Sequence, residues 1–148
     1  MAEIAFHFNA PDKVAYAYRL LRKAVASGAK VVVVVPAEQM DHVDESLWTF
    51  SQLEFLAHCR MDSPQALRKA SPVHLATSLD TMDALTSRDV LLNLKDVVCE
   101  GFEQFTQVIE VVTLDDADRQ MARKRWKQYT DQGFDIVRHD LKLKESLV

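Results

Sequence analysis

The chain contains little glycine or proline and has no long apolar run. Only 3 glycines and 4 prolines occur in 148 residues, so little of the sequence suits a disordered linker. No apolar stretch is long enough to span a bilayer, and the N-terminus MAEIAFHFN lacks the pattern of a secretory signal. We therefore expect a single cytoplasmic domain over residues 1–148, in which residues 139–148 form a frayed tail or a short docking segment.

The net charge and the reactive side chains also restrict the classes of function that the sequence allows. The formal net charge is -4, whereas domains that bind nucleic acid broadly are usually basic. Cys59 and Cys99 have no CxxC spacing, which favours reduced thiols over a disulfide or a metal site. The five histidines form no metal-binding pattern such as HExxH, and no serine lies in a GxSxG turn. The sequence therefore predicts no catalytic residue, no metal ion and no cofactor.

Apolar patterns alternate between the periods of strands and helices along the chain. Alternating apolar residues predict a strand over 4–8, and a stripe at helical spacing predicts a helix over 13–27. Five consecutive valines over 31–35 predict a central strand that is buried on both faces. Further strands are predicted over 73–76, 89–94, 107–113 and 134–137, and a second helix over 37–50. This order predicts a three-layer α/β sandwich with a largely parallel central sheet, and it leaves the strand order open.

The first turn from strand to helix reads HFNAPDK. It contains no glycine and matches neither GxGxxG nor GxxxxGK[ST], so nothing in it is suited to hold a phosphate. The fold is therefore predicted to be Rossmann-like without a nucleotide-binding loop.

A helix is predicted between Asp115 and Gly133, with an uneven distribution of charge. Acidic residues open it, where exposed N–H groups favour negative charge, and Gly133 suits the left-handed conformation that ends a helix. Between Arg119 and Lys127 there are five basic residues and no acid. A basic helix face is most often simply solvated, so this pattern alone does not define a site.

Spacing on this helix brings a cationic side chain next to an aromatic one. Arg119, Arg123 and Trp126 share one side, and Ala122, Trp126 and Tyr129 form an adjoining apolar stripe. A guanidinium beside a half-buried aromatic ring suits a carboxylate that is attached to an apolar group.

A second set of aromatic residues follows the helix predicted over 37–50. Open α/β sheets usually bind ligands beyond the carboxyl ends of their strands. The segment after Val35 leads to Trp48 and Phe55, and the segment after Val112 leads to the basic helix. We therefore expect the two segments to converge, although core packing is an equal alternative for these aromatic residues.

Several segments, taken together, are specific enough to indicate a protein family. They are the opening strand FHF, the Gly28–Lys30–valine segment, VDESLWTFSQLEFLAH, RDVLLNL, and the valine strand followed by MARKRWKQYTDQGF. With them the chain resembles the chi subunit family of bacterial DNA polymerase III from the N-terminal strand to Phe134. Two departures stand out, because the family usually has proline at the position of Ala57 and commonly tyrosine at the position of Trp126.

This resemblance implies an adaptor without a catalytic site of its own, associated with the clamp loader in DNA replication. The family binds the psi subunit and the acidic C-terminal tail of single-stranded-DNA-binding protein, which ends in an aromatic residue with a free carboxylate. By resemblance, Arg123 would hold the terminal carboxylate and Arg119 would attract the upstream acids. The residues that would line the pocket for the aromatic end are Trp48, Phe55, Val112 and Trp126.

Two other classes of function stay open. One is direct binding of single-stranded nucleic acid through residues 119–127, with Trp126 stacking on bases. The other is a small α/β enzyme whose site matches no known motif.

Overall fold

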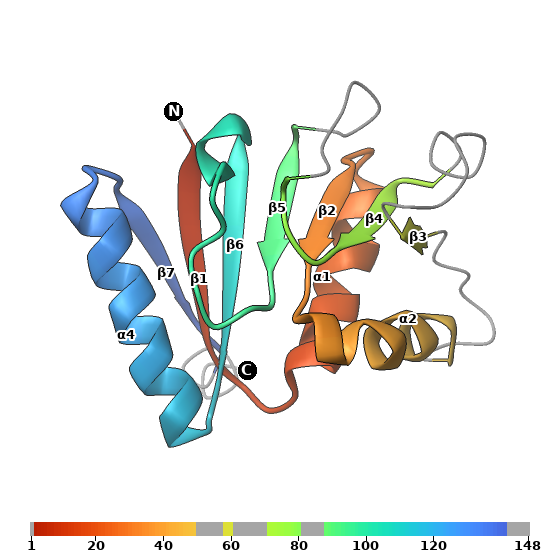
Figure 1. The fold of residues 1–148 in the computed structure, drawn as a ribbon, viewed down its shortest axis with the longest axis horizontal. Helices are drawn as coiled ribbons and strands as arrows, with labels where there is room; N and C mark the ends of the chain where they lie inside the picture. The colour runs from red at the N-terminus through yellow and green to blue at the C-terminus, as the bar shows by residue number, and fades with distance from the viewer. Residues whose placement is uncertain (1, 50–57, 61–70, 81–87, 142–148) are drawn as a thin grey trace.

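A computed structural model describes residues 2–49, 58–60, 71–80 and 88–141, with the backbone alone at Trp48 and Cys59. Within these ranges seven strands form one sheet in the order β3-β4-β2-β5-β6-β1-β7, and each neighbouring pair is parallel (Figure 1). The strands are β1 (Glu3–Ala10), β2 (Val31–Val34), β3 (His58–Arg60), β4 (Val73–Ala76), β5 (Val90–Asn93), β6 (Gln107–Thr113) and β7 (Ile136–Asp140). The predicted α/β class and parallel sheet are confirmed.

Helices cover both faces of this sheet. They are α1 (Lys13–Ala26), α2 (Met40–Thr49) and α4 (Asp116–Asp131), with 3-10 turns η1 (Ala37–Gln39) and η2 (Phe102–Gln104). Figure 1 shows α4 beside β7 at one end of the sheet and α2 near β3 and β4 at the other. No helix in the described ranges is both long enough and apolar enough to cross a bilayer.

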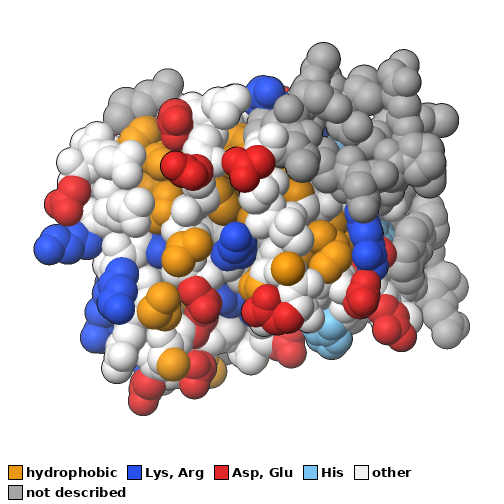
Figure 2. Space-filling model, in the orientation of Figure 1, with side chains coloured by type: hydrophobic (Ala, Val, Ile, Leu, Met, Phe, Trp, Pro, Cys, Tyr) orange, Lys and Arg blue, Asp and Glu red, His pale blue; other side chains and the backbone are white. Residues whose placement is uncertain are grey.

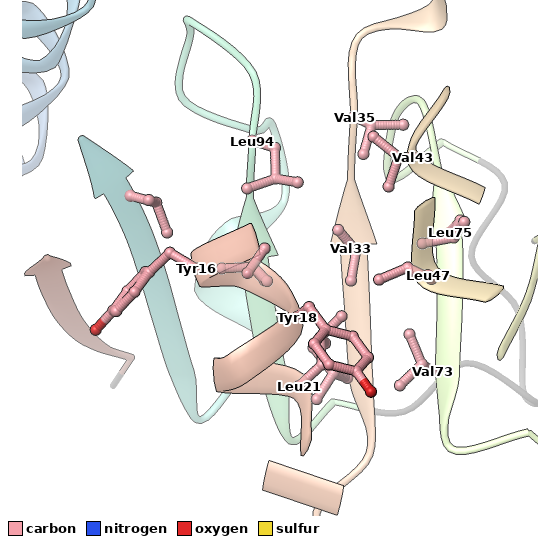
Figure 3. Close-up of a cluster of buried hydrophobic side chains, with 14 of the residues drawn as sticks. Tyr16, Tyr18, Leu21, Val33, Val35, Val43, Leu47, Val73, Leu75 and Leu94 are labelled. Atoms are coloured by element: carbon pink, nitrogen blue, oxygen red, sulfur yellow. The ribbon is translucent and has the colours of Figure 1, made fainter. Parts of the chain in front are cut away.

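The valines of β2 divide the core into two clusters. Val31 and Val33 pack with Leu21 of α1 and Leu47 of α2 on one face of the sheet (Figure 3). Val32 and Val34 belong to the cluster on the other face, which also contains Ala122 and Tyr129 of α4. Successive side chains of a strand point to opposite faces, so α2 and α4 lie on opposite sides of the sheet.

The strand order is the feature that local sequence patterns did not provide. The predicted strand–helix–strand unit exists as β1, α1 and β2, but β5 and β6 lie between its two strands. The end of the predicted tail, residues 142–148, lies outside the described residues.

The edge strand was predicted two residues too early. Phe134 still belongs to the turn that ends α4, because its N–H donates to the carbonyl of Tyr129 at 3.1 Å. Gly133, at φ +88°, makes that turn possible. Strand β7 therefore begins at Ile136 rather than Phe134, and it continues to Asp140, into the segment predicted as tail.

Candidate functional site

A pocket of about 360 Å³ opens between α4 and the strands β1 and β7. Its volume is in the range of pockets that hold small ligands or single side chains of a partner. It is lined by Phe8, Arg119, Ala122, Arg123, Trp126 and Arg138. Three of these lining residues are apolar and three are arginines, so the surface combines an apolar floor with a cationic rim.

The floor is held rigid by contacts between aromatic rings. The ring centroid of Trp126 lies 5.1 Å from that of Phe6 and 5.9 Å from that of Phe8. Phe6 is fully buried, whereas Phe8 and Trp126 are half-buried and therefore remain available to a ligand. Packing of this kind fixes the indole before a ligand arrives, which reduces the entropy that binding costs.

Arginine side chains from two elements form the rim. Arg119 and Arg123 are exposed and lie one turn apart on α4. Among the residues that the structure describes, neither guanidinium has a hydrogen bond or an ion pair. Figure 2 shows Lys and Arg side chains gathered over α4. A smaller pocket of about 190 Å³ adjoins the first and shares both arginines.

Arg138 supplies the third positive charge from the edge strand β7. Its Cζ atom lies 4.9 Å from the centroid of the Phe8 ring. The described residues that line the main pocket include no acid, although the whole chain carries a net charge of -4. The pocket is therefore suited to an anionic group that has an apolar body.

The start of α4 is fixed by Asp115 and Asp118. Asp115 caps the helix by accepting a hydrogen bond from the backbone N–H of Asp118. The Asp118 carboxylate accepts from the Thr113 N–H at 2.8 Å and hydroxyl at 3.0 Å, and from Lys13 Nζ at 2.9 Å. Burial alone would raise the pKa of Asp118, but these bonds outweigh it and hold the pKa below its usual value.

A buried ion pair attaches the middle of α4 to the sheet. Arg125 Nε donates to Glu110 Oε1 at 3.0 Å, and both side chains are almost fully buried. Glu110 Oε2 accepts from the Tyr129 hydroxyl at 2.6 Å and from Asn93 Nδ2 at 3.0 Å. Arg125 Nη1 also donates to the carbonyl of Asp96. Burial raises the pKa of Glu110, and the guanidinium of Arg125 opposes that rise.

This ion pair corrects the predicted charge pattern of the helix. Only four of the five basic residues between Arg119 and Lys127 are exposed, because Arg125 is buried. The spacing did contain the signal, since Arg125 lies three residues after Ala122 and four before Tyr129, on the apolar stripe. Glu110 likewise alternates with Val108 and Val112 on the face of β6 that packs under α4.

The structure brings together three of the six predicted peptide-binding residues. Arg119, Arg123 and Trp126 line one pocket. Val112 is fully buried in the core cluster that also contains Trp126, so it supports the site from beneath and is not one of the lining residues.

The expected convergence of the two segments is not seen in the described ranges. Trp48 belongs to α2, which packs on the opposite face of the sheet from α4, so the helix that carries it does not reach this pocket. The indole of Trp48 and the whole of Phe55 lie outside what the structure describes, and their part in the site stays a prediction.

Phe8 and Arg138 are site residues that the sequence did not predict. Phe8 is the third member of the alternating set Ile4, Phe6 and Phe8, from which a strand was predicted and no binding role. Arg138 lies just beyond the predicted end of the edge strand at Val137, so its direction was not assigned.

The cysteine and histidine side chains of the described ranges were also considered as possible reactive groups. No group of three or more His, Cys, Asp or Glu residues in these ranges could hold a metal ion. Cys99 is a free, buried thiol, as predicted, and burial raises its pKa to about 12. The His58 ring, fully buried, hydrogen-bonds Asp44 at 2.8 Å at the far end of the sheet.

Comparison with known proteins assigns the chain to a family. Residues 1–137 match the family model described as DNA polymerase III chi subunit, HolC. The chain is 34% identical over 111 residues to the DNA polymerase III subunit chi of Haemophilus influenzae, with 74% of each protein covered. It is 30% identical over 131 residues to subunit chi of Pseudomonas aeruginosa, with 84% of each covered. It is 28% identical over 111 residues to subunit chi of Escherichia coli, covering 74% of this chain and 73% of that protein. The chain belongs to the DNA polymerase III chi subunit family.

Proposed function

We propose that this chain tethers the DNA polymerase III complex to single-stranded-DNA-binding protein by holding the acidic C-terminal tail of that protein. As a chi subunit, the chain is an accessory subunit of the polymerase and not a catalytic one. The resemblance also supports the psi subunit of the clamp loader as a second partner, and a location in the cytoplasm with the replication machinery.

The observation that carries the proposal is an aromatic floor surrounded by arginines and, among its described lining residues, by no acid. A C-terminal aromatic residue offers both parts of the matching surface, because its ring is apolar and its carboxylate is anionic. We assign the carboxylate to Arg123, whose planar guanidinium can donate two parallel hydrogen bonds. Arg119, one turn away on α4, then faces acids that precede the terminal residue.

The expected affinity follows from these two contacts. Burial of one aromatic side chain contributes about 1.5–3 kcal/mol, and a charge-assisted hydrogen bond contributes about 1.5–3 kcal/mol. Together with the pairing of upstream acids and the cost of ordering a flexible tail, these contributions are consistent with a Kd on the order of micromolar. Several tails on one oligomer would strengthen the apparent binding through their effective concentration.

Direct binding of single-stranded nucleic acid has less support from the same residues. Arg125 is buried in an ion pair, and part of the Trp126 surface is covered by Phe6 and Phe8. A gel shift with an oligonucleotide and this protein alone separates the two functions. Binding at micromolar protein concentration would favour the nucleic acid, and no shift is expected.

Titration of an acidic tail peptide into the Arg123→Ala variant tests the proposal. We expect the Kd to rise about tenfold or more, because a charge-assisted hydrogen bond is lost. Lys124→Ala is the matched control, since Lys124 is an exposed neighbour on the same helix and is not among the lining residues. Its Kd should stay within about twofold of the wild-type value. Wild-type affinity in a correctly folded Arg123→Ala protein would contradict the site.

A further inference from the structure

Arg138 lines the same pocket as the arginines of α4 but comes from a different element. It comes from the edge strand β7, where it lies opposite Phe6 in the strand register and stacks over the ring of Phe8. Stacking uses the face of a guanidinium and leaves the N–H groups at its edge able to donate. Its side chain is 63% exposed, so these donors are accessible from the pocket.

Among the residues that the structure describes, the ionic contact of these donors is a weak one. It is an ion pair with Asp140, whose carboxylate oxygen lies 3.9 Å from Arg138 Nη2, beyond hydrogen-bonding distance. The other carboxylate oxygen of Asp140 accepts a hydrogen bond from Asn9 at 2.8 Å. Arg138 is therefore a cation held over an aromatic ring, with a long and largely exposed ion pair to Asp140 beside it.

We propose that Arg138 binds an acidic side chain that precedes the terminal residue of the peptide ligand. This inference rests on the proposed function. Arg119 and Arg123 lie together on α4, and Arg138 comes from β7, so two elements bring positive charge to one apolar floor. A terminal aromatic residue on that floor directs its carboxylate to Arg123, and the chain that leads away from it passes Arg138.

Specificity follows from this arrangement. A ligand with a terminal carboxylate but no neighbouring acid satisfies only the α4 side of the pocket. A ligand with both charges pairs with both walls, so the pocket selects acidic C-terminal segments over other chain ends of the same apolar character.

A double-mutant cycle between protein and peptide tests the inference. The probe is a synthetic peptide in which several aspartates precede a C-terminal phenylalanine, and its variants carry asparagine at one aspartate at a time or a C-terminal amide. Each peptide is titrated into the wild-type protein and into Arg138→Gln. We expect Arg138→Gln to raise the Kd of the parent peptide about two- to fivefold, as for the loss of an exposed ion pair. That difference in Kd should vanish with one asparagine variant of the peptide. Amidation of the peptide should raise its Kd for both proteins by the same factor.

Arg22→Gln is the matched control, because Arg22 is also an exposed arginine over an aromatic ring, at 5.6 Å from the centroid of Tyr18. It lies on α1, which packs on the other face of the sheet, and its substitution should leave every Kd unchanged.

Three outcomes would overturn the inference while leaving the proposed function in place. In the first, Arg138→Gln binds every peptide with the Kd of the wild type. In the second, the difference in Kd between the two proteins persists with all asparagine variants. In the third, that difference vanishes only when the peptide is amidated. A wild-type protein that does not distinguish the free carboxylate from the amide would instead contradict the proposed function itself, and with it the role of Arg138.

Discussion

At the scale of single residues, Asp118 determines where α4 begins and therefore where Arg119 lies. One carboxylate accepts bonds from the end of β6, through Thr113, and from the start of α1, through Lys13. The start of α1 is thus joined to the turn from β6 into α4, which is over 100 residues away in sequence, through one side chain. Such a carboxylate stabilises the fold only while it is ionised.

The Asp118→Asn variant is expected to lower the free energy of unfolding by about 1–2 kcal/mol at pH 7, because hydrogen bonds to a charged acceptor are replaced by weaker ones. The folded pKa of Asp118 is lowered, so its contribution is present above the unfolded pKa and is lost as the pH falls through the folded value. Urea unfolding at pH 7 and below about pH 3.9 measures this, and the two proteins should converge in acid. A difference that is the same at both pH values would show that the charge is not responsible.

Sequence reasoning found some site residues and missed others for a simple reason. Arg123 and Trp126 lie on one helix, where a fixed angle per residue relates them. Phe8 and Arg138 reach the same pocket from two strands, so their proximity depends on the pairing of β1 with β7. That pairing links residues over 100 positions apart, and no local pattern contains it.

At the scale of elements, the Arg125–Glu110 pair holds α4 against β6. Both side chains are buried, and the carboxylate of Glu110 also accepts bonds from Tyr129 and Asn93. The removal of one member of a buried ion pair is costly mainly because the other charge is then left without a partner. The position of the pocket's α4 wall therefore depends on a pair that does not itself line the pocket.

We expect Arg125→Met to lower the free energy of unfolding by about 3–5 kcal/mol. The double variant Arg125→Met, Glu110→Gln should be more stable than Arg125→Met alone, because a neutral amide needs no counterion. Urea denaturation of the wild type, both single variants and the double variant provides the comparison. A double variant as unstable as the sum of both single changes would show that the two side chains contribute independently.

The elements themselves were largely predictable, whereas their arrangement was not. The valines over 31–35 required burial on both faces, and β2 is buried on both. The same patterns could not show that β5 and β6 lie between β1 and β2, because strand order depends on contacts between distant segments. The predicted convergence of Trp48 and Phe55 with the basic helix depends on such contacts too, and it stays a prediction, although α2 and α4 pack on opposite faces of the sheet.

At the scale of the whole molecule, a protein of net negative charge gathers arginines around a pocket in the part of the chain that the structure describes. The net charge is -4, yet three arginines from α4 and β7 surround a single aromatic floor. The fold supplies a rigid surface with its charges already in place, and the chi family membership places it in a polymerase assembly. We propose that this surface binds a flexible chain end without changing it chemically.

The free carboxylate of the ligand is the most direct point to test. The wild-type protein is titrated with an acidic peptide that ends in phenylalanine and with the same peptide closed as a C-terminal amide, in one buffer and at one salt concentration. We predict that amidation raises the Kd about tenfold or more, because the hydrogen bonds from Arg123 lose their charged acceptor. Equal Kd values for the two peptides would contradict a pocket that recognises a chain terminus.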